Sequence, residues 1–583
     1  MNPTPALTTL PRLTKPPPRV RTRSRGRGRS AGPLHPILLM AVLLLALAAC
    51  DDGPSERPGA GPPSGSTADE FPLMDWTVSE LQSAMSDGSL TSRDVTALYL
   101  DRIEALDRQG PTLRSMIAVN PEALTVADSL DDERRQGRIR GPLHGIPVVL
   151  KDNIDTADRM PTTAGSLALE GSIPPRDAFI VERLREEGAI LLGKANLSEW
   201  ANFRSTQSSS GWSGVGGQVR NPYILDRTPC GSSSGSGVVV SANLAPLAVG
   251  TETDGSVVCP AAATGVVGIK PTVGLVSRSG IIPIAHSQDT AGPMARTVAD
   301  AAVLLNAMVG SDPRDSVTDP ESGLEGRPRV VEEDYTRFLE DATLVGARIG
   351  VVREGLTGYH PATDRLFQQA VEDLRNAGAE VVDDLAIPHL GEYGEAEFTI
   401  LLYEFKDGLN AYLSGLGAGG RVGSLADVIA FNEAERERSM PFFGQEILLM
   451  AQEKGDLTEP EYLEALETAR LAGAGIDALM EAHSLDALVA PTTTLPWAID
   501  PVVGDHYRGA SSTPAAVAGY PNITVPMGRA FELPAGISFF GRAWSEGTLI
   551  GLAQAYETLS GHRTPPRFLP SLDAPGLEGG AGG

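Results

Sequence analysis

The sequence predicts an α/β fold, because short apolar runs of strand length alternate with segments of helical periodicity. The runs lie at residues 146–150, 189–192, 245–249, 349–352, 381–382 and 487–489. Between 352 and 381, one face of a helix is marked by Phe367, Ala370, Val371 and Leu374, and Gly378 is placed to end it. Residues 349–382 are therefore predicted to form a strand, a helix and a second strand.

Two further segments are helical in pattern. Folded sequence is expected to begin near Asp75, where Thr77 or Ser79 can cap a helix. An apolar stripe at helical spacing follows, made by Val95, Leu98, Tyr99, Ile103 and Leu106. Residues 395–482 are also mainly helical, with interruptions expected at Pro460 and at 473–475. No chemistry can be assigned to this second segment, which is a candidate substrate-facing insertion.

The first 49 residues have the pattern of an export signal. One Lys and seven Arg, with no acidic residue, precede an apolar run at 36–49. That run is too short for a membrane-spanning helix, which needs about 20 residues, and it ends in small residues directly before Cys50. The tetrapeptide ending at Cys50 resembles the bacterial lipobox, which implies cleavage after residue 49 and lipidation of Cys50. The alternative is an ordinary signal peptide with an incidental cysteine.

On this interpretation the mature protein is an exported lipoprotein of the cell envelope, held to a membrane by its N-terminal lipid. Residues 50–70, rich in Gly, Pro and Ser, would be a flexible tether. Removing the eight basic residues of 1–49 changes the formal charge from −26 to about −34. Such a surface repels nucleic acid, so nucleic acid is not an expected partner.

Cysteine usage does not indicate a disulfide framework. Apart from Cys50, only Cys230 and Cys259 are present. These two could pair, but we expect small packed thiols instead.

Two glycine- and serine-rich loops bracket a helix-and-strand segment. They are Cys230-Gly-Ser-Ser-Ser-Gly-Ser-Gly237 and Gly250-Thr-Glu-Thr-Asp-Gly-Ser256. Glycine permits positive φ and close backbone approach, so each loop can turn several NH groups toward one point. A tetrahedral oxyanion needs such a cluster of donors.

These loops resemble those of the amidase signature family, and Ser232 and Ser256 stand 24 residues apart, which is the family's spacing. Upstream, Lys151 in Gly145-Ile-Pro-Val-Val-Leu-Lys151 stands where the family has its catalytic lysine. Further similar stretches are Thr162–Gly165, Gly193–Glu199, Gly265–Pro271, Asp289–Arg296 and Gly519–Pro526. The resemblance runs from about residue 76 to residue 556.

The resemblance implies a single domain over residues 71–565, built on a large twisted mixed β-sheet surrounded by helices, with a disordered tail at 566–583. It also implies that Ser256 attacks the amide carbon, that Ser232 passes the proton to Lys151, and that an acyl-enzyme forms. Backbone NH groups of Thr253, Asp254, Gly255 and Ser256 would form the oxyanion hole. In the family the bridging serine, here Ser232, follows a cis peptide bond.

Elementary chemistry agrees with these roles. A serine hydroxyl is a weak nucleophile until a base takes its proton, and a lysine can be that base when burial makes it neutral. Lys151 follows an apolar run, although a salt bridge to Asp152 is the simpler interpretation of an isolated lysine. Asp254 replaces the family's usual glycine. Its carboxylate would oppose an oxyanion, so we expect that side chain to point outward.

Two other interpretations remain. Gly231-Ser-Ser-Ser-Gly235 satisfies the nucleophile elbow of α/β-hydrolases, which would make the chain an esterase with Ser233 as nucleophile and His286, His483 or His506 as base. The segment before it has the pattern of a loop rather than of the apolar strand that an elbow requires. The other interpretation is an inactive, membrane-tethered binding protein.

No cofactor or metal is expected, since the sequence has no His-Glu-x-x-His, no cysteine pair at ligand spacing and no phosphate-binding glycine loop ending in Lys and Ser or Thr. Within the family, Gly211–Gly217, Asn221–Tyr223 and His286–Asp289 are most similar to bacterial peptide amidases. The predicted activity is therefore hydrolysis of a carboxamide to a carboxylic acid and ammonia or an amine, with C-terminal peptide amides as the favoured substrates. Aryl, aliphatic and amino-acid amides remain open, as does the oligomeric state.

Overall fold

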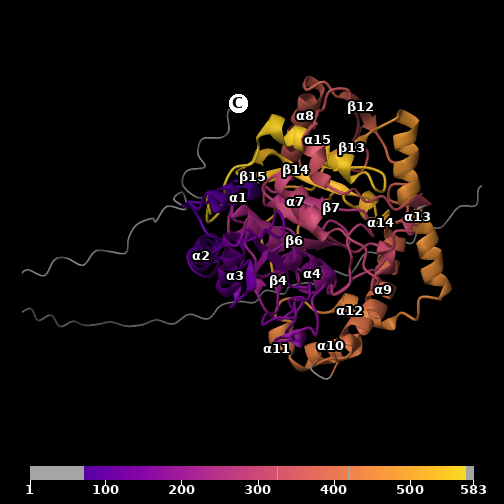
Figure 1. The fold of residues 1–583 in the computed structure, drawn as a ribbon. Coiled ribbons are helices and arrows are strands. Elements are labelled where there is room, and N and C mark those ends of the chain that lie inside the picture. The colour runs from indigo at the N-terminus through magenta and orange to yellow at the C-terminus, as the bar shows by residue number, and fades with distance from the viewer. Residues whose placement is uncertain (1–70, 325, 418–419, 573–583) are drawn as a thin grey trace, which may run out of the picture. The chain divides into compact units, whose positions relative to one another are not determined.

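A mixed sheet of 11 strands forms the centre of the structure, a computed structural model that describes residues 71–324, 326–417 and 420–572 (Figure 1). In spatial order the strands are β1 (Met116–Val119), β3 (Ile190–Ala195), β2 (Pro147–Lys151), β6 (Leu247–Glu252), β8 (Thr290–Ala295), β7 (Val267–Lys270), β14 (Asn522–Ala530), β15 (Leu533–Phe540), β13 (Ala487–Pro491), β11 (Arg348–Val352) and β12 (Glu380–Leu385). β2 runs parallel to β3 and β6, and β11 runs parallel to β12 and β13, whereas the other pairs are antiparallel. The α/β class and the mixed sheet are thus confirmed.

All six predicted apolar runs are strands, namely β2, β3, β6, β11, β12 and β13. The other five strands were missed. In β14 and β15 the apolar pattern is interrupted by Pro526, Gly528, Pro534 and Gly536, residues that are rare in strands. Two short hairpins lie outside the sheet, β4 (Trp212–Ser213) with β5 (Gly217–Gln218) and β9 (Gly323–Leu324) with β10 (Arg327–Pro328).

Helices surround the sheet. Thr77 caps α1 (Val78–Asp87) through a reciprocal pair of bonds with Glu80. The apolar stripe lies on a second helix, α2 (Ser92–Arg102), and on the π-helical turn Ile103–Arg108 that continues it. The remaining helices near the sheet are α3 (Ala123–Arg135), α4 (Phe179–Glu186), α5 (Ser234–Ser241), α6 (Val258–Ala263), α7 (Val298–Met308), α8 (Pro361–Asn376), α14 (Thr513–Val517) and α15 (Glu546–Ser560). The predicted unit β11, α8, β12 is confirmed, and Gly378 follows α8 with a φ of 95°.

The segment 395–482 is helical, as predicted. It contains α9 (Gly394–Gly415), α10 (Leu425–Ala434), α11 (Arg436–Ser439), α12 (Glu446–Glu453) and α13 (Pro460–His483), drawn in orange in Figure 1. Pro460 begins α13, but the interruption expected at 473–475 is wrong, because α13 runs through it. A Cβ on Gly475 would lie 2.3 Å from the Pro388 carbonyl oxygen, so this glycine allows close packing rather than a break.

The predicted signal at 1–49, lipidation at Cys50, the tether at 50–70 and the tail from residue 573 lie outside the described residues. Residues 566–572 are part of the folded unit, contrary to the expected tail: Leu569 pairs with Ile224, and its NH donates to the Tyr223 carbonyl at 3.1 Å. These main-chain bonds order the segment beyond the predicted boundary at 565. None of the helices within the described ranges combines the length and the apolar character needed to cross a membrane.

Candidate active site

Lys151 and Ser232 meet at one edge of the sheet. Lys151 is the last residue of β2, and its neighbour β6 runs parallel to it, so both strands end at the same edge. Ser232 lies in the loop before α5 and follows a cis peptide bond from Gly231, as the resemblance implied. The Lys151 Nζ donates to the Ser232 Oγ at 2.7 Å. The structure thus places two of the three predicted catalytic side chains in direct contact.

The ammonium of Lys151 has no carboxylate partner among the described residues. Its side chain is fully buried, and Nζ also contacts the Thr251 carbonyl oxygen at 3.1 Å and the Thr251 Oγ1 at 2.8 Å. Burial lowers the pKa of Lys151 to about 7, against weaker opposing effects of Asp289 and Glu252. The alternative salt bridge to Asp152 does not form, because that carboxylate accepts from Thr163. A lysine in this state can act as a base near neutral pH.

Ser256 lies in the loop between β6 and α6. It is 8% exposed and lines a cavity of about 610 Å³ together with Ser232 and the loop residues Thr253, Asp254 and Gly255. Gly255 has a φ of 74°, which a side chain at this position would oppose. Within the described chain, the NH groups of residues 253–256 donate to no main-chain carbonyl. They are therefore free to bind an oxyanion in the cavity.

The loop is fixed by the side chain of Glu252. Its Oε2 accepts from the NH groups of Val257 at 2.7 Å and Val258 at 3.0 Å. Glu252 therefore caps the start of α6 directly after Ser256 and holds the backbone on both sides of that serine.

The Asp254 side chain is bonded to Thr513, a residue that does not line the active-site cavity. Its Oδ2 accepts from the Thr513 Oγ1 at 2.6 Å, and its Oδ1 is buried without a hydrogen-bond partner among the described residues. Burial raises the pKa of this carboxyl. The Thr513 hydroxyl, which lies 259 positions away in the sequence, holds the side chain against the cavity wall, and local sequence gave no sign of it.

Cys230 and Cys259 form a disulfide with a Cα–Cα distance of 6.0 Å, so the expectation of two packed thiols is wrong. Both residues line the active-site cavity. Cys230 stands two residues before Ser232 and Cys259 three residues after Ser256, so the bond covalently joins the chain segments that carry these two serines. The only sign of this disulfide in the sequence is that each cysteine lies close to one of the two serines.

Ser233 is not placed as a nucleophile. It is fully buried, and its Oγ lies 3.1 Å from the Thr251 carbonyl oxygen and 3.2 Å from the Thr251 NH. Of the histidines proposed as its base, His286 and His506 contact Glu404 and Asp500 instead. The esterase interpretation therefore lacks a base at hydrogen-bonding distance among the described residues.

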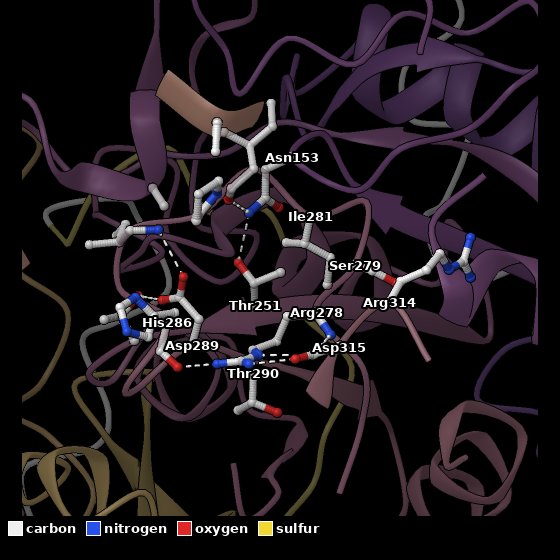
Figure 2. Close-up of a pocket in the computed structure, with 16 residues that line it drawn as sticks. Asn153, Thr251, Arg278, Ser279, Ile281, His286, Asp289, Thr290, Arg314 and Asp315 are labelled. Carbon is white, nitrogen blue, oxygen red and sulfur yellow. Dashed lines mark hydrogen bonds and ion pairs between the residues drawn. The ribbon is translucent and has the colours of Figure 1, made fainter. Parts of the chain in front are cut away.

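A second cavity, of about 360 Å³, is lined in part by Thr251 and Thr253, and Figure 2 shows the residues that line it. Asp289 occupies its wall and accepts from the Thr253 Oγ1 at 2.5 Å and from the NH groups of Ile284 and Ala285. Burial raises the pKa of Asp289 to about 6. The role of Asp289 in holding the loop was not predicted, although the residue lies in a stretch that carries the family resemblance.

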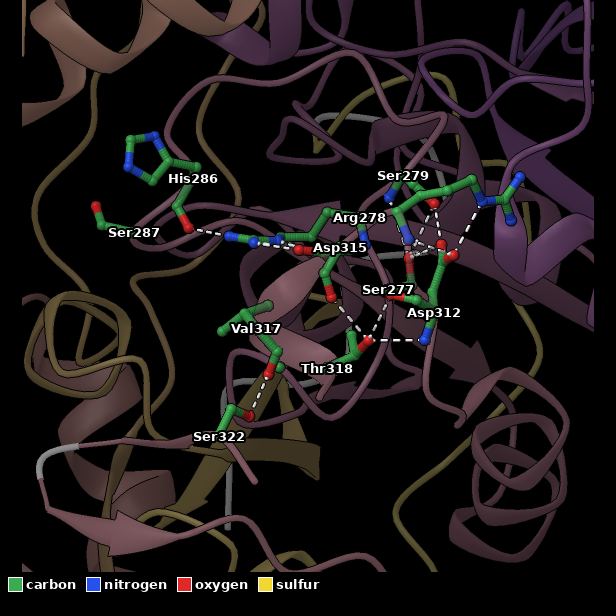
Figure 3. Close-up of polar contacts among 12 residues, drawn as sticks. Ser277, Arg278, Ser279, His286, Ser287, Asp312, Asp315, Val317, Thr318 and Ser322 are labelled. Atoms are coloured by element: carbon green, nitrogen blue, oxygen red, sulfur yellow. Dashed lines mark hydrogen bonds and ion pairs between the residues drawn. The ribbon is translucent and has the colours of Figure 1, made fainter. Parts of the chain in front are cut away.

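The chain segment that carries Asp289 is itself fixed by an ion-pair network, shown in Figure 3. The Arg278 Nε donates to Asp315 at 2.9 Å, and another of its guanidinium nitrogens donates to the His286 carbonyl. The Asp312 carboxylate accepts from Ser277 and Ser279. Because its charge is already paired, Arg278 supports the wall of the second cavity rather than offering a free cation.

No group of three potential metal ligands occurs among the described residues. The geometry instead offers a buried base, two serine hydroxyls and a cluster of free NH groups around one cavity. These are the parts that acyl transfer through a serine requires.

Comparison with known proteins gives a consistent result. The Amidase family model matches residues 94–550. The solved structure of the peptide amidase from Stenotrophomonas maltophilia is 54% identical, with a TM-score of 0.81, over 85% of this chain and 99% of that protein. The solved structure of an amidase family protein from Bacillus anthracis is 39% identical, with a TM-score of 0.76, over 85% of this chain and 92% of that protein. A probable amidase of Arabidopsis thaliana is 42% identical over 508 residues, or 86% of this chain and 93% of that protein.

Proposed function

This chain belongs to the amidase signature family and is an amide hydrolase, and we propose that it cleaves a carboxamide C–N bond with Lys151, Ser232 and Ser256 as its catalytic triad. The observation that carries the proposal is the contact of 2.7 Å between the Ser232 Oγ and a fully buried lysine whose pKa is about 7. At neutral pH a substantial fraction of that lysine is unprotonated and able to accept a proton.

In the proposed reaction the Ser256 Oγ attacks the amide carbon while its proton passes through the Ser232 hydroxyl to Lys151. The resulting oxyanion is bound by the NH groups of Thr253, Asp254, Gly255 and Ser256, each donor contributing about 3 to 4 kcal/mol in comparable hydrolases. Lys151 returns the proton, through Ser232, to the nitrogen as the C–N bond breaks. Water then attacks the acyl-enzyme and releases the carboxylic acid.

We infer that the substrates are C-terminal peptide amides. Two features support this class. The relative of 54% identity is itself a peptide amidase. The active-site cavity is also large, about 610 Å³, and the side chains that line it include Phe203, Leu401, Trp497 and Tyr507, which can contact a peptide chain as well as the scissile amide.

The test is ammonia release from peptide, aryl and aliphatic amides by protein lacking residues 1–50. We expect Ser256→Ala and Lys151→Ala to abolish turnover of the best substrate and Ser233→Ala to retain much of it. Loss of activity in Ser233→Ala alone would instead support the esterase-type elbow. If the wild type released ammonia from none of the amides, a binding role or an untested substrate would replace the proposal.

We also propose that the protein is exported and attached to a membrane through a lipid on Cys50. The motif itself lies outside the described residues. Support comes from the disulfide between Cys230 and Cys259, because such bonds persist mainly in oxidising compartments outside the cytosol.

A further inference from the structure

The active-site cavity adjoins a third cavity, of about 600 Å³, on the side of α14. Ala510 lines both cavities, and the neighbouring residues Ser512 and Thr513 line the first and the third, respectively. The two cavities are therefore neighbours, and the upstream residues of a peptide held at Ser256 would pass Ala510 to reach the third cavity.

Two carboxylates lie at the junction between these cavities. Asp254 is placed there by its bond of 2.6 Å from Thr513. Glu397 comes from α9, four residues after Tyr393, which lines the third cavity, and four residues before Leu401, which lines the active-site cavity. Residues four apart lie on the same face of a helix, so Glu397 shares the face of α9 that carries Tyr393 and Leu401. Both Glu397 and Asp254 lie near Tyr393, because burial and then the charges of these two carboxyl groups raise the pKa of Tyr393.

The junction contains polar atoms without partners. The Tyr393 side chain is 1% exposed, and its hydroxyl, like the Oδ1 of Asp254, is buried with no hydrogen-bond partner among the described residues. Buried polar groups in this state are uncommon and call for a partner that the chain itself does not supply. A ligand bearing N–H donors would supply it once a side-chain movement exposes these atoms.

Among the described residues, no protein cation fills the junction, since neither cavity is lined by a lysine or an arginine. The ammonium of Lys270 is buried and donates to the Tyr520 carbonyl at 2.7 Å. Burial and the charge of Asp254 together raise the pKa of Glu397 to about 8. Burial also raises the pKa of Asp254. A cation bound between the two carboxyl groups would favour their ionised forms, which burial otherwise disfavours.

We propose that Asp254, Glu397 and Tyr393 form a subsite for a cationic group, an ammonium or a guanidinium, on the acyl portion of the substrate. The subsite lies close to the reacting carbonyl. Asp254 is two residues before Ser256, and their Cα atoms are at most about 7.6 Å apart, since consecutive Cα atoms are about 3.8 Å apart. We assign the cation to the second residue upstream of the scissile amide, either as a free N-terminus or as a basic side chain, because the first residue carries the carbonyl that Ser256 attacks. The inference rests on the proposed peptide-amide hydrolysis.

The experiment compares kcat/KM for three dipeptide amides: acetyl-Nle-Phe-NH2, acetyl-Lys-Phe-NH2 and Nle-Phe-NH2 with a free N-terminus. The first is neutral, the second carries a side-chain cation and the third an N-terminal cation, so the comparison also identifies which source the subsite accepts. We expect the wild type to prefer at least one cationic amide by about 10-fold or more over the neutral one.

Glu397→Gln keeps an acceptor for the Gln288 amide, which donates to Glu397 at 3.0 Å, but removes the charge. It should reduce the preference to below about 3-fold, and Asp254→Asn should act in the same direction. The control is Glu395→Gln, an exposed carboxylate in the first turn of the same helix, which should leave the preference at its wild-type value.

Each outcome separates the subsite from the reaction. If the neutral amide is hydrolysed but neither cationic amide is preferred, the subsite is refuted and the peptide-amidase proposal stands. If Glu397→Gln lowers all three rates equally, Glu397 has a structural role and the subsite is again refuted. If the wild type hydrolyses none of the three while another amide class is turned over, both the peptide-amide class and the subsite are wrong.

Discussion

The hydroxyl of Thr251 controls the charge of the proposed base, and its removal gives a sharp test. The Lys151 Nζ has three acceptors, the Ser232 Oγ, the Thr251 carbonyl oxygen and the Thr251 Oγ1. Thr251→Val keeps the shape and the carbonyl but removes the hydroxyl contact of 2.8 Å. The fully buried ammonium then lacks one acceptor, so its pKa should fall further.

The magnitude follows from that lost contact. A hydrogen bond to a charged group contributes about 1.5 to 3 kcal/mol, and about 1.4 kcal/mol corresponds to one pKa unit. The pKa of Lys151 is about 7 in the wild type. The rising limb of kcat/KM against pH should therefore move from about 7 to roughly 5 to 6 in Thr251→Val.

The assay is ammonia release from a neutral peptide amide, measured as kcat/KM from pH 5 to pH 10. The matched control is Thr290→Val, which removes a buried hydroxyl from the neighbouring strand and from the same cavity (Figure 2). That hydroxyl contacts the Ala291 carbonyl and not Lys151, so the control should keep its limb at about 7. A limb that stays in place or moves to higher pH in Thr251→Val would refute the reasoning.

Three further predictions concern stability and attachment. Lys151→Met should stabilise the fold by up to about 5 kcal/mol below pH 7, and by progressively less toward pH 10, in urea unfolding. The pKa of Lys151 is about 7 in the folded wild type and 10.5 in the unfolded chain. Between these pH values only the unfolded chain holds the proton. The stability of the wild type therefore falls as the pH is lowered from 10.5 to 7. Replacing both Cys230 and Cys259 by serine should lower the free energy of unfolding by about 3 to 4 kcal/mol, the entropy of closing a loop of this length, and dithiothreitol should destabilise only the wild type. Cys50→Ser in the full-length chain should abolish incorporation of labelled palmitate and release the protein from the membrane fraction, and persistence of the label would exclude this site.

The parallel part of the sheet was predictable from the sequence, whereas much of the antiparallel part was not. β2, β3 and β6 are buried on both faces, so they appear as continuous apolar runs. β8 (Thr290–Ala295) and β14 contain Gly and Pro, and the side chains packed against them come from distant parts of the chain. β8 pairs with β6, and β14 pairs with β7. These two segments are strands because of this pairing and not because of a local apolar pattern.

The candidate site divides in the same way. Lys151, Ser232 and Ser256 were identified because their loops have a distinctive order and spacing. Two other contacts depend on tertiary geometry, namely the disulfide between Cys230 and Cys259 and the hydrogen bond from Thr513 to Asp254. The sequence around these residues does not reveal that they meet. The same holds for Asp289, whose partner Thr253 lies 36 residues away.

Strand geometry explains why Lys151 can remain unpaired although an acid follows it directly in the sequence. Side chains alternate between the two faces of a strand, so Lys151 and Asp152 leave the end of β2 in opposite directions. Asp152 accepts from the Thr163 NH at 3.2 Å. Burial raises the pKa of Asp152 to about 6, and the strongest opposing effect is the charge of Lys194, the buried lysine of the adjacent strand β3. Lys194 in turn donates to the Ile154 carbonyl at 2.6 Å and to Thr162 at 2.7 Å. The carboxylate next to the proposed base is thus directed to the other face of the sheet, and Lys151 is left with neutral acceptors. Under this condition burial can bring the pKa of Lys151 to about 7.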